Sequence, residues 1–253
     1  MSNIPGQKPK PVRQASRISG PFPELYLRYL RKENRTYDDA EVRGLPDPFF
    51  YNLHKQEWAL KAKSAERLIK YLDRGGKDGE VFRLLEIGTG TGWLASMIAN
   101  MPQYEVVGVD VIPSLLEQAA RVFPWPNLDF VLGDIFEDIF PKASFDLIVL
   151  FDTLQYFPSL QQLINRCREY LKQGGEIHLL ETPLWAEKEQ EEAAQRTKGY
   201  YTQLGIPELV DFHHHHTKKE LSTFDYQYLY RPGGLSRLFG GKDSEYPWVK
   251  VVN

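Results

Sequence analysis

Short apolar runs alternate with amphipathic stretches along the middle of the chain, and this alternation constrains the fold more than any other feature. Each apolar run is long enough for one buried strand, and the segments between the runs have apolar residues at helical spacing. Strands that alternate with helices predict a parallel sheet with helices on both faces. The predicted strands are 81–87, 104–110, 128–132, 145–151 and 176–181, and the predicted helices are 91–100, 113–122 and 160–172.

Further elements are predicted on both sides of this core. A helix is expected at 23–33, and a second one begins at Asp47-Pro48, because aspartate caps a helix and proline suits its first turn. After the core, 185–203 has a charged helical pattern, and Thr217 starts a capping box that predicts a short helix. Two late strands are predicted at 226–230 and 246–252.

The composition is that of an ordinary globular protein. The 253 residues suffice for one large domain or two small ones, and 42% of them are hydrophobic and 26% charged. No apolar run approaches the roughly 20 residues that a bilayer requires, and no apolar segment follows Met1. The single cysteine, Cys167, excludes an intramolecular disulfide and a cysteine-based zinc cluster. A cytoplasmic protein is expected.

Charge is distributed unevenly along the chain. The net charge of −3 gives no general attraction to nucleic acid, so a nucleic-acid partner is not expected. Residues 1–35, however, contain eight lysines and arginines against two glutamates, together with several prolines. A solvated and partly disordered arm is the main interpretation, and a contact surface for an anionic partner is the alternative.

The strongest local motif is the segment 84–92, Leu-Leu-Glu-Ile-Gly-Thr-Gly-Thr-Gly. A predicted strand ends there, a glycine-rich turn follows, and a helix begins. Glycines allow the backbone to approach a ligand closely and to direct amide groups at it. Trp93 occupies the place of the third glycine in the dinucleotide fingerprint, which disfavours NAD and FAD.

Acidic residues follow the next two strands. Asp110 ends the second predicted strand, where a carboxylate can accept hydrogen bonds from ribose hydroxyls or can simply cap the following turn. Asp134 follows the third strand after Gly133. Open α/β sheets bind ligands at the carboxyl ends of their strands, and 152–156 lies at that edge after the fourth strand.

Taken in order, these elements resemble the class I S-adenosylmethionine-dependent methyltransferases over roughly residues 80–183. The shared motifs are the E-x-G-x-G-x-G turn, the acidic end of strand two, the Gly-Asp after strand three, the F-D-L-I-V strand and the L-K-x-G-G turn before strand five. The resemblance implies an α/β fold with three layers and a doubly wound, seven-stranded, mainly parallel sheet. The last strand of this sheet would be antiparallel, and an N-terminal helical extension would precede the α/β core.

The resemblance also implies S-adenosylmethionine as cofactor and a role for each matching residue. The three glycines would wrap the methionine and ribose, Glu86 would hold the methionine amino group, and Asp110 the ribose. Asp134 would orient the adenine, and Phe151 would lie beside the methionine moiety. The complete set of implied cofactor-binding residues is Glu86, Gly88, Thr89, Gly90, Gly92, Trp93, Asp110, Val111, Asp134, Ile135 and Phe151.

The predicted organisation has two parts. Residues 1–45 form the basic, proline-rich arm with its short helix, and 46–253 form the methyltransferase domain. Within the domain, 46–80 is the helix before the core, 81–183 the cofactor-binding core, 184–223 an insert that covers the substrate, and 224–253 the last two strands.

Four consecutive histidines, His213–His216, precede the capping box. On an extended segment only alternate side chains share a face, so a metal site would need ligands from elsewhere and none is expected. The run is either structural or places at least one imidazole against the substrate. The candidate catalytic residues are therefore His214, His216 and Tyr156.

The sequence favours methyl transfer to a small or medium-sized organic acceptor, at oxygen first and at nitrogen second. A hydroxyl acceptor would also need a base. Three alternatives stay open: a methyltransferase for RNA or protein that uses the basic arm, an NAD-dependent oxidoreductase, and a non-catalytic module that binds the cofactor.

Overall fold

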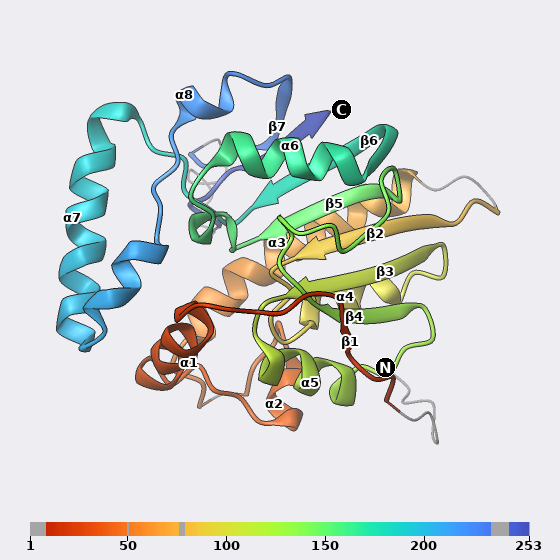
Figure 1. The fold of residues 1–253 in the computed structure, drawn as a ribbon, viewed down its shortest axis with the longest axis horizontal. Coiled ribbons are helices and arrows are strands. Elements are labelled where there is room, and N and C mark those ends of the chain that lie inside the picture. Colours follow the sequence, from red (N-terminus) through yellow and green to blue (C-terminus); the bar gives the residue numbers. More distant parts are fainter. Residues whose placement is uncertain (1–8, 50, 76–78, 234–242, 253) are drawn as a thin grey trace. The chain divides into compact units, whose positions relative to one another are not determined.

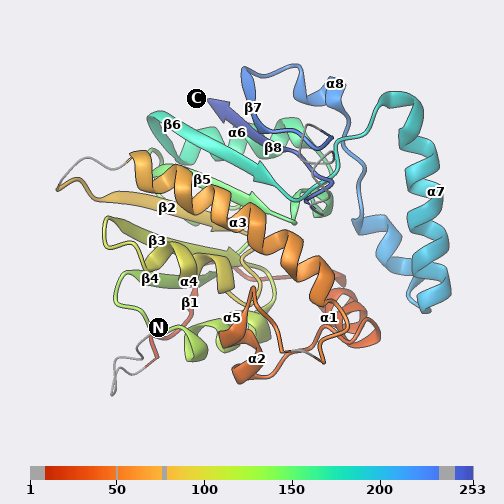
Figure 2. The ribbon, with the colours of Figure 1, turned by 180° about the vertical axis from the view of Figure 1, so that it is seen from behind.

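The computed structural model describes residues 9–49, 51–75, 79–233 and 243–252. The chain divides into two compact units, whose helices and strands are labelled in Figures 1 and 2. Unit 1 comprises Met1–Ile18 and Tyr37–Ile139, and unit 2 comprises Ser19–Thr36 and Phe140–Asn253.

Unit 1 contains four parallel strands. Their order is β1 (Arg13–Gln14), β4 (Leu128–Leu132), β3 (Tyr104–Asp110) and β2 (Phe82–Ile87). The helices of this unit are α2 (Asp39–Gly44), α3 (Lys55–Gly75), α4 (Trp93–Ala99) and α5 (Pro113–Val122).

Apolar side chains on both faces of the strands hold unit 1 together. Leu84 and Leu85, neighbours on β2, are both fully buried although they point to opposite faces. Helix α3 buries Leu68 and Leu72, and the hydroxyl of Tyr104 donates a hydrogen bond of 2.9 Å to the Leu72 carbonyl. Figure 2 shows this helix in front of the strands. Strands buried on two faces explain why the sequence has continuous apolar runs there.

Unit 2 contains the other four strands, in the order β5 (Phe145–Phe151), β6 (Leu171–Leu180), β8 (Trp248–Val252) and β7 (Tyr226–Tyr230). Strands β5 and β6 are parallel, whereas β8 is antiparallel to both of its neighbours. The helices of the unit are α1 (Phe22–Lys32), α6 (Leu160–Tyr170), α7 (Glu187–Leu204) and α8 (Lys218–Leu221), with 3-10 turns η1 (Leu154–Tyr156) and η2 (Pro207–Phe212).

Helix α1 packs against α7 and η2, which lie far away in the sequence. Leu25 of α1 is buried in one cluster with Tyr201, Ile206 and Leu209. The arginine Arg28 also donates to the carbonyl of Gly205, the left-handed residue that ends α7. An amphipathic N-terminal helix is thus part of unit 2.

The predicted fold class is confirmed: the chain is α/β, its strands are mainly parallel, and the last one is antiparallel. The strand count differs, since the described residues form eight strands where seven were predicted. The additional strand is β1, in the arm that was expected to be solvated. Arg13 pairs with Val131 and Gln14 with Leu132. A two-residue edge strand has no periodic pattern, so the sequence could not predict it.

Helix α3 begins at Lys55 and not at Asp47. The segment from Asp47 onward makes turns first, and the amide of Asp47 donates to the Gly44 carbonyl. The side-chain oxygen of Asn52 accepts a hydrogen bond of 2.8 Å from the amide of His54. The helix therefore starts after a turn that the Asn52 side chain stabilises, and not at the Asp47-Pro48 pair.

No helix within the described ranges combines the length and apolarity needed to cross a bilayer.

Gly92 offers a test of packing in unit 1. Its φ is +73°, and a Cβ added there would lie 2.6 Å from Cζ of Phe130 and 2.9 Å from Cβ of Ala119. We expect Gly92→Ala to lower the free energy of unfolding by about 1–3 kcal/mol, measured by urea denaturation. Gly44→Ala is the control, because nothing lies within 4 Å of the added carbon there. Equal effects of the two substitutions would contradict the packing argument.

Candidate functional site

The glycine-rich turn joins β2 to α4 in unit 1. Gly88, Gly90 and Gly92 all have positive φ, at 73°, 52° and 73°. A Cβ at Gly90 would meet no atom within 4 Å, in contrast to the crowded site at Gly92. The turn is therefore closely packed where it enters the helix and open in its middle, where a ligand could approach the backbone.

Asp110 ends β3 and binds this turn. Its Oδ2 accepts a hydrogen bond of 2.8 Å from the amide of Gly90, and its Oδ1 accepts one of 3.0 Å from the amide of Ile112. Burial raises the pKa of Asp110, while the amide donors, including that of Val111, act in the opposite direction. Each carboxylate oxygen has a further lone pair with which it can accept a hydrogen bond from a ribose hydroxyl.

Glu86 lies near the end of β2 and is only 3% exposed. The hydroxyl of Thr89 donates a hydrogen bond of 2.7 Å to its Oε2. Burial raises the pKa of Glu86 to about 8, the Thr89 hydrogen bond opposes this rise, and the charge of Asp110 adds to it. A cationic group bound beside this carboxyl would stabilise its ionised form, so the site suits an ammonium group.

Asp134 follows β4 and caps its own turn. Its Oδ1 accepts a hydrogen bond of 2.9 Å from the amide of Phe136. Its own amide donates to Oγ of Ser16, also at 2.9 Å. The next residue, Ile135, is buried. The turn is thus held in one conformation by hydrogen bonds on both of its sides.

The structure joins four of the predicted cofactor residues directly. Glu86, Thr89, Gly90 and Asp110 are joined by the hydrogen bonds above. Trp93 packs edge-on against Trp58, with ring centroids 5.5 Å apart, so much of its surface is used in the core. Phe151 ends β5 and belongs to unit 2.

In unit 2 the histidine run lies along η1. The amide of His214 donates a hydrogen bond of 2.7 Å to the Gln155 carbonyl. The rings of His213 and His215 lie on one side, with centroids 5.0 Å apart. This is the alternation expected for an extended segment.

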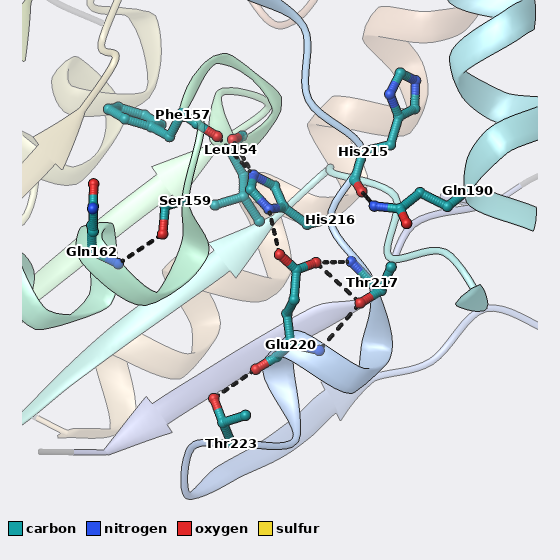
Figure 3. Close-up of polar contacts among 10 residues, drawn as sticks. All are labelled: Leu154, Phe157, Ser159, Gln162, Gln190, His215, His216, Thr217, Glu220 and Thr223. Carbon is teal, nitrogen blue, oxygen red and sulfur yellow. Dashed lines mark hydrogen bonds and ion pairs between the residues drawn. The ribbon is translucent and has the colours of Figure 1, made fainter.

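His216 is buried and holds η1 (Figure 3). Its Nε2 lies 3.1 Å from the carbonyl oxygen of Leu154 and 3.0 Å from that of Phe157, while its Nδ1 lies 3.8 Å from a carboxylate oxygen of Glu220. Carbonyl oxygens only accept hydrogen bonds, so Nε2 is the protonated nitrogen. This nitrogen cannot take a proton from a substrate, and we therefore regard His216 as a residue that positions η1.

Removal of this imidazole tests its structural role. His216→Ala removes the imidazole donor from the carbonyls of Leu154 and Phe157, of which, among the described residues, only that of Leu154 keeps another donor, the amide of Phe157. We expect the free energy of unfolding to fall by about 1–2 kcal/mol in urea denaturation. His214→Ala is the matched control, because the ring of His214 makes no hydrogen bond with the part of the chain that the structure describes. A comparable loss of stability in both variants would argue against the role of His216 in positioning η1.

Tyr156, the last residue of η1, lies in a cluster of aromatic rings. The centroids of Phe22 and Tyr26 are 5.4 and 5.3 Å from that of Tyr156, and that of His213 is 6.0 Å away. The hydroxyl of Tyr201 lies 2.9 Å from Nδ1 of His213. Burial raises the pKa of Tyr156 well above 10 and lowers that of His213 to about 4. At neutral pH the tyrosine is therefore a phenol and the imidazole is neutral.

Two of these residues were not predicted as site residues. His213 belongs to the histidine run, but the sequence does not show which member contacts an aromatic ring. Tyr201 lies on the charged helix α7, and nothing in the pattern of that helix distinguishes it. Within the described residues, no group of three or more histidine, cysteine, aspartate or glutamate side chains could hold a metal ion.

Comparison with known proteins identifies the class of the domain. Residues 84–175 match a family model described as a methyltransferase domain. A malonyl-[acyl-carrier protein] O-methyltransferase from Halalkalibacterium halodurans is 32% identical over 123 residues, which cover 46% of this chain and 45% of that protein. A sterol 24-C-methyltransferase from Saccharomyces cerevisiae is 26% identical over 255 residues, which cover 89% of this chain and 64% of that protein.

A solved structure has the same fold over most of the chain. Geranyl diphosphate C-methyltransferase from Streptomyces coelicolor, in complex with Mg2+, geranyl diphosphate and S-adenosyl-L-homocysteine, superimposes with a TM-score of 0.57 at 14% identity. The match covers 93% of this chain and 98% of that one. Residues 84–175 therefore match a methyltransferase domain, the chain shares the fold of this methyltransferase, and the comparisons support S-adenosylmethionine as the cofactor. The chain spans less than two thirds of the length of the two curated relatives.

Proposed function

We propose that the protein is an enzyme that transfers the methyl group of S-adenosylmethionine to a small or medium-sized organic acceptor, at oxygen or, as second choice, at nitrogen. The observation on which this rests most is the arrangement of Gly90, Asp110 and Glu86. The open glycine turn is bound to the part-buried carboxylate of Asp110, and the buried carboxyl of Glu86, whose pKa is raised, lies just before that turn in the chain. Ribose hydroxyls suit the first carboxylate and an ammonium group suits the second.

When bound, the cofactor supplies an electrophilic methyl group on a positively charged sulfur. With that methyl group on its oxygen or nitrogen, the acceptor would have to lose a proton, and the sulfur left behind would be a neutral thioether. Much of the acceleration can come from alignment of the two reactants. The protein also has to take the acceptor's proton, which requires a group that is unprotonated at the working pH.

Unit 2 has side chains suited to these tasks. Burial lowers the pKa values of His213 and His214, so both imidazoles are unprotonated at pH 7, although the same shift makes them weaker bases. Tyr156 stays protonated, and its hydroxyl forms a hydrogen bond with that of Tyr201. We assign acceptor contact to Tyr156 and proton removal to one of the two imidazoles.

The aromatic rings around Tyr156 favour an acceptor with an apolar or aromatic body next to its nucleophilic group. The names of the relatives include both an O-methyltransferase and C-methyltransferases. Oxygen is our first choice because a neutral imidazole matches the deprotonation of a hydroxyl.

Calorimetry with S-adenosylmethionine and S-adenosylhomocysteine, and with NADH and NADPH as controls, tests the proposal. We expect micromolar binding of the first pair only. Binding of the nicotinamide cofactors alone by a folded protein would support the oxidoreductase alternative instead.

Methyl transfer itself requires a second measurement. The protein is incubated with methyl-labelled S-adenosylmethionine and a panel of carboxylic acids, phenols and amines, and the products are identified by mass spectrometry. Label in an oxygen- or nitrogen-linked methyl group is expected. A carbon-linked product would refute the choice of atom, and cofactor binding without transfer to this panel, to RNA or to protein would support a non-catalytic module.

A further inference from the structure

The N-terminal segment 10–16 follows β4 from the beginning of that strand to the turn after it (Figure 1). At the beginning, the ammonium group of Lys10 donates to the carbonyl of Pro126 at 2.7 Å and to Oδ1 of Asp129 at 2.8 Å. One base of the arm is therefore paired within the protein and is not simply solvated.

Further along, strand β1 pairs with the second half of β4. The amide of Ala15 donates a hydrogen bond of 2.8 Å to the Leu132 carbonyl, so pairing continues one residue beyond the strand. A Cβ placed on Gly133 would lie 3.5 Å from Cβ of Ala15. The arm is thus in van der Waals reach of the Gly133-Asp134 turn.

The contact ends at Ser16, whose hydroxyl accepts the hydrogen bond from the amide of Asp134. This contact joins residues 118 positions apart and involves the first amide after Gly133. The other hydrogen bonds at this aspartate come from the residues that follow it: its Oδ1 accepts from the amide of Phe136, and its carbonyl accepts from the amide of Glu137 at 3.0 Å. Ser16 is therefore the arm's own restraint on the turn.

We propose that Ser16 is a positioning residue for the cofactor. By holding the amide of Asp134 it fixes the turn that orients the adenine, so that affinity for the adenosine half of the cofactor depends on the N-terminal arm. This inference rests on the proposed function, because it requires S-adenosylmethionine as cofactor and the role at the adenine that the methyltransferase resemblance implies for Asp134. It also assigns the basic arm a function that does not require binding of an anionic partner, the alternative considered for residues 1–35.

The test measures binding of two probes to the full chain by calorimetry. S-adenosylhomocysteine contains both halves of the ligand, and 5′-methylthioadenosine contains the adenosine half without the amino acid. We expect Ser16→Ala to raise the dissociation constants of both probes by the same factor, roughly threefold to tenfold, which is the effect of one hydrogen bond. Ser16→Thr retains the hydroxyl and should restore both affinities.

Ser144→Ala is the matched control. Its hydroxyl donates a hydrogen bond of 2.7 Å to the Pro141 carbonyl in unit 2, so the same atom is lost at a site without a role in binding. Unchanged affinity of Ser16→Ala for both probes would overturn the inference, as would a loss confined to S-adenosylhomocysteine. Failure of the wild-type protein to bind either probe would instead overturn the proposed function.

Discussion

Replacement of Asp110 by alanine is expected to weaken the binding of S-adenosylhomocysteine at least tenfold. The substitution removes a carboxylate that can accept two ribose hydroxyls, and hydrogen bonds to charged groups contribute about 1.5–3 kcal/mol each. It also releases the amide of Gly90, which Oδ2 of Asp110 holds at 2.8 Å. The glycine turn then loses the contact that orients it. Calorimetry on the purified variant measures the change directly.

Glu105→Ala is the control for this experiment. Glu105 lies on β3, the strand that Asp110 ends, and its side chain is 60% exposed. Its loss should leave the affinity unchanged. Asp110→Asn retains the shape and one acceptor oxygen, so an intermediate affinity is expected. If Asp110→Ala binds as tightly as the wild-type protein, the assignment of the ribose to this carboxylate is wrong.

Much of the fold could be predicted from the sequence because each element of the core is defined by its own residues. Strands β4 and β5 and helix α5 have the predicted bounds. A strand buried on both faces must be apolar throughout, and a helix that covers a sheet must be apolar at every third or fourth position. These requirements are local, and the amino-acid pattern therefore reports them.

Contacts between distant segments could not be predicted in this way. Strand β1 exists because two residues pair with β4, and no property of Arg13 or Gln14 alone indicates a strand. The same is true of Ser16, whose hydroxyl acts on Asp134.

The histidine run shows where the prediction of the site reached its limit. The geometry of an extended chain correctly placed alternate rings on the same side. The task of each ring depends on its partners, however. His216 faces two carbonyls, whereas His213 faces Tyr201, and only tertiary structure supplies these neighbours. The sequence analysis proposed both His216 and Tyr156 as catalytic candidates. In the structure His216 binds the carbonyls of η1, whereas Tyr156 lies in the aromatic cluster.

Replacement of Glu86 by glutamine should change both the stability and the cofactor affinity in a way that depends on pH. The pKa of Glu86 is about 8 in the folded protein and near 4.5 in the unfolded chain. Between these values the folded state retains a proton that the unfolded state has lost. The wild-type free energy of unfolding therefore falls as the pH rises toward 8, relative to that of Glu86→Gln. Urea denaturation from pH 6 to pH 9 measures this difference.

Cofactor binding should show the opposite trend. An ammonium group favours the ionised carboxyl, so wild-type affinity for S-adenosylhomocysteine should rise as the pH approaches 8. Glu86→Gln should bind S-adenosylhomocysteine roughly tenfold more weakly than the wild-type protein at pH 8.5. Because the variant lacks this carboxyl, its affinity should not rise with pH in this range. Binding of 5′-methylthioadenosine, which has no ammonium group, should not follow this profile. Glu105→Gln is the control, because Glu105 lies on β3 with its side chain 60% exposed. An identical pH profile in wild type and Glu86→Gln would show that this carboxyl does not hold the amino group.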